Sequence, residues 1–99
     1  MPLTDPPMEA EDGVIRRNPQ VVYRELAGEG GGVLLHLESG AYHGLNETGS
    51  LIWDLIDGER TFDVLVAELR LRLDDAPEDL DAETERFLAD LRERDLIAR

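Results

Sequence analysis

The spacing of apolar residues changes once along the chain. In the first half, short apolar segments rich in β-branched and aromatic side chains alternate with Gly-containing turns, which is typical of antiparallel strands. These segments predict strands at 21–26, 33–38 and 41–45. A shorter apolar segment at 14–17 could form one more strand, which Pro19 would limit.

The register of the second hairpin depends on its turn. We expect a two-residue turn at 39–40, where Ser is followed by Gly. That turn places Leu37 opposite Tyr42, and it places His36 opposite His43. A shift by one residue would exchange the two faces of the sheet.

After residue 45 the apolar residues recur with the period of a helix. Asn46 is a good N-cap and Gly58 a good terminator, so the first helix is expected between them. Thr61 is expected to cap the second helix. The third helix is expected to begin near Asp79 or Asp81.

This order of elements predicts an α+β fold, in which a three-stranded antiparallel β-meander is followed by three α-helices. The helices would cover one face of the sheet in a winged-helix-like packing. We expect residues 1–13 to form a disordered acidic N-terminal arm, and residues 14–99 to form a single domain.

Composition and charge exclude several functions. The chain has 23 Asp and Glu against 10 Lys and Arg, a net charge of −13, so binding to nucleic acid or to acidic lipid is unfavourable. No apolar run approaches the roughly 20 residues of a membrane span, and the N-terminus does not look like a secretion signal. With no cysteine there is no thiol nucleophile or thiolate metal site. We therefore expect a cytoplasmic protein without a cofactor.

The two histidines are the candidates for a metal site. In the expected register His36 and His43 face each other, with Glu38 next along the same face, and these groups could hold zinc. A structural zinc site needs four ligands, and no cysteine or third histidine completes this one. We therefore favour two half-exposed histidines without a metal.

The strand at 41–45 comes last in the meander, so we expect it at an edge of the sheet. It contains no Lys, Pro or outward charge, which are the usual features that block an edge strand. An unblocked edge favours pairing with a partner strand. Tyr42 on this strand could be a core residue or one wall of a groove.

The segment 36–73 carries the most specific pattern in the chain. It contains, in order, Leu37-Glu38-Ser39-Gly40, Tyr42, Leu45-Asn46, Gly49, Ile52-Trp53, Leu55-Ile56 and Gly58. The last helix adds Phe87-Leu88, Leu91 and Leu96-Ile97. On these residues, the chain from about residue 20 onward resembles the PqqD-like family, the precursor-peptide recognition elements of ribosomally made, modified natural products (RiPPs).

Two positions depart from the family pattern. Asp95 stands where the family usually has Gly, but Asp tolerates a left-handed φ, so the last helix can still end there. Glu83 stands where many members have Asp, and its carboxylate reaches one methylene further.

The resemblance implies a non-catalytic peptide-binding accessory protein, with no metal and no cofactor. The family binds a leader peptide as a strand added to the edge of the third strand, against the third helix. For this chain the implied leader-binding residues are Ala41, Tyr42, His43, Gly44, Leu45, Glu83, Phe87, Asp90, Leu91 and Arg94. The other flank of that helix, with Glu85, Leu88 and Arg92, is the alternative wall.

The resemblance also implies the partners. The small stand-alone form is most similar to the recognition subunit of a lasso-peptide biosynthesis pathway. Such a subunit acts as a peptide chaperone and presents the precursor to a leader peptidase or to a modifying enzyme such as a cyclase.

Three other functions stay open. A winged-helix-like transcription regulator needs a basic recognition helix, whereas the third helix mixes Arg86, Arg92 and Arg94 with acids. Retained binding to duplex DNA would favour this function. A module that binds a folded protein is a second possibility. A small metal-dependent enzyme would use His36 and His43, and stoichiometric zinc would favour it.

Overall fold

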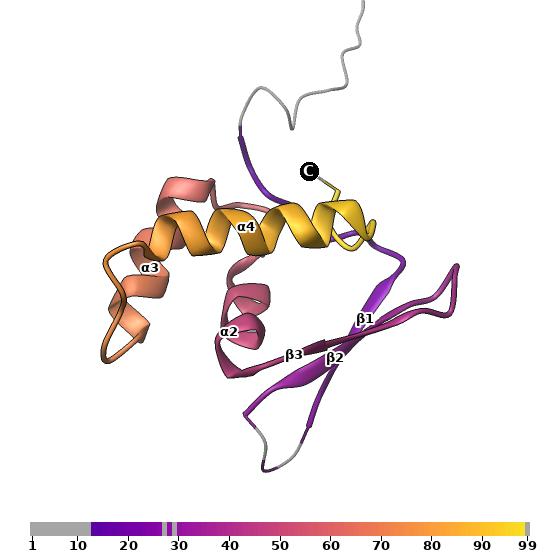
Figure 1. Ribbon diagram of the computed structural model, residues 1–99. Coiled ribbons are helices and arrows are strands. Elements are labelled where there is room, and N and C mark those ends of the chain that lie inside the picture. The colour runs from indigo at the N-terminus through magenta and orange to yellow at the C-terminus, as the bar shows by residue number, and fades with distance from the viewer. Residues whose placement is uncertain (1–12, 27, 29, 99) are drawn as a thin grey trace, which may run out of the picture.

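The chain forms three strands followed by three helices, so the expected α+β order is confirmed (Figure 1). The structure, a computed structural model, describes residues 13–26, 28 and 30–98, and nearly all of the expected N-terminal arm lies outside them. None of the described helices is long and apolar enough to cross a lipid bilayer. In chain order the elements are β1 (Val21–Glu25), β2 (Gly32–His36), β3 (Tyr42–Leu45), α2 (Glu47–Leu55), α3 (Phe62–Arg72) and α4 (Leu80–Glu93).

The three strands form one antiparallel sheet with β2 in the centre. In the second hairpin, Leu34 lies opposite His43, and Leu35 lies opposite Tyr42. The expected pair of Leu37 and Tyr42 therefore does not form. Leu37 belongs instead to the turn that follows β2.

The expected pair of His36 and His43 is wrong by two residues. The N–H of His36 donates to the carbonyl of Ala41 over 2.9 Å, and the N–H of Gly40 donates to the carbonyl of His36 over 2.7 Å. The chain thus turns over residues 37–40, with Gly40 at a left-handed φ of 78°, so the loop is longer than two residues. Because the shift is two residues, both histidines keep the face that is turned toward the helices.

Residues 14–17 do not join the sheet. Val14 forms a single bridge with Thr61, and Arg17 forms one with Ile97. Between them, Ile15 is only 4% exposed and packs in the core. The segment is extended because it crosses between the start of α3 and the C-terminal residues, and its pairing partners lie there.

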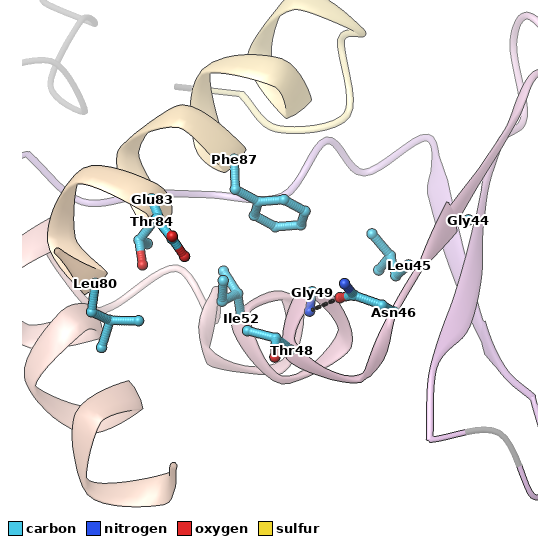
Figure 2. A pocket seen from close by; sticks show the side chains of 10 residues that line it. All are labelled: Gly44, Leu45, Asn46, Thr48, Gly49, Ile52, Leu80, Glu83, Thr84 and Phe87. Atoms are coloured by element: carbon cyan, nitrogen blue, oxygen red, sulfur yellow. Dashed lines mark hydrogen bonds between the residues drawn. The ribbon is translucent and has the colours of Figure 1, made fainter. Parts of the chain in front are cut away.

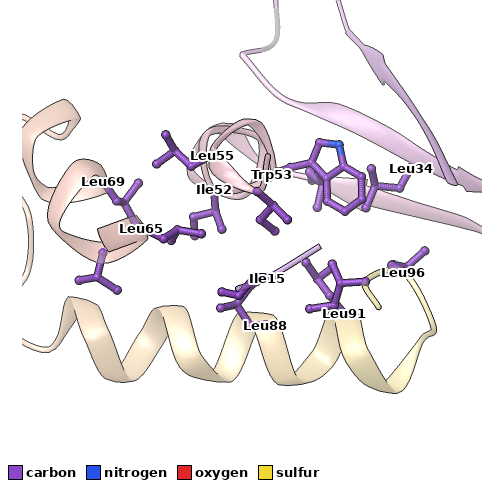
Figure 3. Packing of buried hydrophobic residues seen from close by; sticks show 14 of the residues in the cluster. Ile15, Leu34, Ile52, Trp53, Leu55, Leu65, Leu69, Leu88, Leu91 and Leu96 are labelled. Atoms are coloured by element: carbon purple, nitrogen blue, oxygen red, sulfur yellow. The ribbon is translucent and has the colours of Figure 1, made fainter. Parts of the chain in front are cut away.

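The core begins at one face of the sheet beneath α2 and α4 and continues to α3, which packs against these two helices (Figure 3). Leu34 on β2 is fully buried and is the main contribution of the sheet. Trp53 on α2 and Leu91 on α4 are 2% and 0% exposed. Burying an apolar side chain of this size contributes about 1.5–3 kcal/mol to stability, so this layer fixes how the helices cover the sheet.

The first two helices begin at the caps that the sequence predicts. The Asn46 side chain accepts a hydrogen bond from the N–H of Gly49 over 2.7 Å. The Thr61 hydroxyl accepts one from the N–H of Val64 over 3.4 Å. The third helix begins at Leu80, and its N-cap residue makes no side-chain capping bond.

The end of α4 is tied to two other segments through Asp95. This residue has a left-handed φ of 63°, as the sequence predicts, and the N–H of Leu96 donates to the carbonyl of Leu91. The Asp95 carboxylate lies 3.0 Å from Nε2 of His36 on β2. The side chain of Asn18 donates to the Asp95 carbonyl over 2.8 Å.

We expect Asp95→Ala to destabilise the fold more than Asp95→Gly. Both changes remove the carboxylate that faces His36, but only Ala is strained at a left-handed φ, by about 1–2 kcal/mol. Chemical denaturation of the two variants and the wild type measures the difference. Equal stability of the two variants would show that backbone strain plays no part at this helix end.

A pH-dependent contribution is expected at the connection between α2 and α3. The N–H of Glu59 and the Arg60 guanidinium hold the pKa of the Asp57 carboxyl below its usual range. Its stabilisation is therefore present above the unfolded-state pKa, about 4, and is lost as the pH falls through the folded-state pKa. Asp57→Asn should cost no more than about 1 kcal/mol at pH 7, because the pair is exposed, and the cost should shrink as the pH falls below about 4. Urea denaturation at several pH values tests this, and a constant difference would contradict it.

Candidate functional site

β3 forms one edge of the sheet, since β2 is the only strand paired with it in the described part of the chain. In an antiparallel ladder, alternate residues point their backbone groups to the neighbouring strand. The hydrogen bond from His36 to Ala41 sets this alternation for β3. The N–H and C=O groups of Tyr42 and Gly44 therefore face the open edge.

A pocket of about 350 Å³ lies beside the end of this edge, between β3, α2 and α4 (Figure 2). Its apolar surface comes from three elements: Leu45 on β3, Ile52 on α2 and Phe87 on α4. The carboxylate of Glu83 lies at the α4 side of the pocket. The full lining is Gly44, Leu45, Asn46, Thr48, Gly49, Ile52, Leu80, Glu83, Thr84 and Phe87.

The shape of the pocket depends on Gly49 in the first turn of α2. A Cβ atom at this position would lie 3.3 Å from the ring of Phe87 and 3.2 Å from the capping oxygen of Asn46. Gly49 is thus the residue that lets the Phe87 ring approach the start of α2. The ring then forms the wall that joins the α4 side of the pocket to the β3 side (Figure 2).

Further along α4, a polar cluster faces β3. Nε2 of His43 lies 3.9 Å from a carboxylate oxygen of Asp90. The same carboxylate accepts hydrogen bonds from Nε of Arg94 at 3.1 and 3.2 Å. His43 is 18% exposed and Asp90 is 42% exposed, so the cluster is half-buried and lies between the strand and the helix.

The structure brings together most of the residues that the resemblance implies. Gly44, Leu45, Glu83 and Phe87 line the pocket. His43, Asp90 and Arg94 form the polar cluster between β3 and α4. On α4, the flank with Glu83, Phe87 and Asp90 faces β3, whereas Leu88 on the alternative flank is buried in the core.

Three of the implied residues lie elsewhere. Leu91 is fully buried, so its side chain packs in the core and does not reach the pocket. Tyr42 is 74% exposed and lies on the outer face of the sheet, beside Val22 and Leu35, because side chains alternate along a strand. Ala41 is exposed and precedes the first residue of β3.

Sequence analysis did not identify six residues of the lining, which are Asn46, Thr48, Gly49, Ile52, Leu80 and Thr84. Asn46 and Gly49 carried a signal, since a cap and a small residue three positions later allow close approach at a helix start. Ile52, Leu80 and Thr84 look like ordinary core positions, and only the packing of α4 across α2 places them at a pocket.

The two histidines do not share a site. His36 faces Asp95, whereas His43 faces Asp90. The side-chain ligand atoms of His36, Glu38 and Asp95 lie within 4.8 Å of one another, which is a possible metal-ligand spacing. However, Nδ1 of His36 accepts the backbone N–H of Glu38, so Nε2 carries the proton and donates it to Asp95. A metal-binding histidine has the opposite pattern, with its second nitrogen donating a hydrogen bond. This geometry favours a structural role.

Comparisons with known proteins agree with this arrangement. A solved structure described as "TbiB1 in Complex with the TbiA(beta) Leader Peptide" matches with a TM-score of 0.72 and 26% sequence identity. The match covers 83% of this chain and 93% of that chain. No curated protein sequence matches significantly.

A family model described as coenzyme PQQ synthesis protein D (PqqD) matches residues 31–97. This segment contains β2, the open edge of β3, and all three helices. It therefore includes every residue that lines the pocket and forms the polar cluster. The chain belongs to the family of coenzyme PQQ synthesis protein D.

Proposed function

We propose that this chain binds the leader segment of a ribosomally made precursor peptide as a strand added to β3. The observation that carries the proposal is an open strand edge that runs directly into a pocket walled by α4. The similar solved structure is described as a complex with a leader peptide, and it shares almost its whole length with this chain. Strand addition is a general mode of peptide recognition, in which backbone pairing supplies affinity and side-chain pockets supply specificity.

The proposed contacts divide between backbone and side chains. The outward N–H and C=O groups of Tyr42 and Gly44 would pair with the leader backbone, with Ala41 and Leu45 at the two ends of the paired segment. One apolar leader side chain would enter the pocket against Phe87.

Charged side chains would set the position of the leader along the groove. Glu83 lies at the pocket, and the cluster of His43, Asp90 and Arg94 lies further along α4. A leader strand beside β3 would run past both. Polar groups at two separated points favour one register of the added strand over its neighbours.

In this proposal the chain performs no chemistry itself. It acts as a peptide chaperone in natural product biosynthesis, and it holds the precursor for a leader peptidase, or for a modifying enzyme such as the cyclase of a lasso-peptide pathway. Tethering the precursor to a carrier that also contacts the enzyme raises the effective concentration of substrate at the enzyme.

Replacing Gly44 with proline should weaken leader binding by up to about tenfold, because proline has no N–H to donate from the open edge. Gly44→Ala is the matched control. A Cβ atom at this position meets nothing within 4 Å, so the Ala variant should fold. Proline is tolerated on an edge strand where the N–H faces outward, and circular dichroism checks that the Pro variant folds. Fluorescence anisotropy with the synthetic leader of the precursor encoded nearest to this gene measures the affinity. Equal affinities of the Pro and Ala variants would exclude β3 as the docking edge.

Reversing the charge at Asp90 should also weaken leader binding by about tenfold, with little change in melting temperature. Asp90→Lys places a positive charge beside Arg94 and His43 and disrupts the cluster that faces β3. Glu85→Lys is the control, because it makes the same charge change at an exposed position of α4 that does not line the pocket. Similar losses in both variants would point to net charge alone and remove Asp90 from the site.

A further inference from the structure

The outer face of the sheet, on the side away from the helices, is apolar. Val22, Val33, Leu35 and Tyr42 line a shallow hollow on it together with Arg24. Val22 is 47% exposed and Tyr42 is 74% exposed. Leu26 and Leu37 continue the alternation just beyond the ends of β1 and β2, and they are 41% and 55% exposed. Four of the six large, exposed apolar side chains among the described residues thus belong to this one face.

Such a face is unusual for a sheet that is covered on one side only. Antiparallel strands with one solvated face normally alternate apolar and polar residues. β2 instead contains three consecutive apolar residues, Val33, Leu34 and Leu35. Such a run is typical of a strand that is covered on both faces. Leu34 packs under the helices, so Val33 and Leu35 are left facing outward.

Charge is distributed so that this face could meet a copy of itself. The chain carries a net charge of −13, yet no Asp or Glu stands at an outward position of the three strands. The single charged residue there is Arg24, which makes no hydrogen bond or ion pair with the described residues. Two copies that meet through these faces bring no strand carboxylates together.

The register makes the face complementary to itself. Arg24, Val33 and Gly44 form one row across the sheet, because Val33 pairs with both of the others. Val22, Leu35 and Tyr42 form the next row in the same way. Arg24 on β1, with its long charged side chain, thus shares a row with Gly44 on β3, which has no side chain.

From this arrangement we infer that two copies of the chain form a symmetric dimer through the outer faces of their sheets. A two-fold axis parallel to β2, lying between the sheets, places β1 of each copy over β3 of the other. Arg24 then enters the space above Gly44 of the second copy and lies next to the ring of its Tyr42, a cation–π pairing. Val33 and Leu35 meet their own counterparts on the axis.

The dimer is independent of the proposed leader binding. Stacking of two sheets covers their faces, whereas the open edge of β3 and the pocket at α4 lie at the side of the sheet and between the strand and the helix. Each copy would keep its own leader groove. Failure of either proposal leaves the other one standing.

Sedimentation velocity on the full chain over a range of concentrations tests the inference. The wild type should shift from the 11.1 kDa monomer toward twice that mass as concentration rises. Added NaCl should strengthen the association, because it screens the repulsion between two acidic copies. A wild type that stays monomeric up to about 1 mM, or an association that weakens with salt, would overturn the dimer and leave this face to a different protein.

Two variants locate the interface. Leu35→Glu places two carboxylates against each other on the axis and should raise the dissociation constant by at least roughly tenfold. Leu71→Glu is the control, since this α3 residue is 81% exposed and lies away from the sheet, and it should dimerise like the wild type. Dimerisation that survives Leu35→Glu but not Leu71→Glu would place the interface elsewhere and contradict the inference.

Circular dichroism shows whether Leu35→Glu folds. If it does not, Gly44→Arg provides the same test, because the open space around Gly44 accommodates a side chain in the monomer. In the dimer that side chain would displace Arg24 of the second copy. A folded Gly44→Arg variant that dimerises as tightly as the wild type would overturn the proposed packing.

Discussion

The position of α4 relative to the sheet depends on how the chain leaves that helix. At Asp95 the backbone takes a left-handed φ, and the same residue contacts His36 on β2 and Asn18 in the segment before β1. One residue thus joins the helix end, the central strand and the N-terminal segment. Without this junction, the helix would be held over the sheet mainly by non-directional apolar contacts such as those of Leu88 and Leu91, with the approach of His43 to Asp90 as a polar contact beside them.

The two ends of α4 are held differently, and the pocket and the polar cluster lie near opposite ends of the helix. The C-terminal end is tied by directional hydrogen bonds, and the polar cluster of Asp90 and Arg94 lies close to it. The N-terminal end has no side-chain cap, and the pocket with Glu83 and Phe87 lies there. In the proposed complex, the charged contacts would therefore lie at the hydrogen-bonded end of α4, and the apolar contact would lie at its uncapped end.

Local signals in the sequence predicted most of the fold. Asn46 and Thr61 act as caps as their side chains suggest, and Asp95 takes the left-handed φ that its side chain tolerates. The hairpin register was not predictable in this way. The Ser39-Gly40 pair is compatible with a two-residue turn, and only the hydrogen bonds of His36 show that the loop has four residues.

The candidate site shows where sequence reasoning stops. The edge position of β3 follows from element order, whereas the flank of α4 and the binding residues on β3 were implied by the family resemblance. Ile52 and Thr84 line the pocket because two helices cross there, and that crossing has no signature in either helix alone. Phe87 and Leu91 belong to the same apolar stripe of α4. Leu91 is fully buried in the core, whereas Phe87 reaches the pocket, because an apolar stripe spans a wide arc of the helix surface.

The shortness of β3 limits how firmly any added strand can be held. Only Tyr42 and Gly44 direct backbone groups to the open edge, which amounts to one donor and one acceptor from each. Hydrogen bonds of this kind contribute about 0.5–1.5 kcal/mol each, so the edge alone cannot give a long-lived complex. In the proposed function this limit would be an advantage, because rapid dissociation would let one copy serve many precursor molecules in succession.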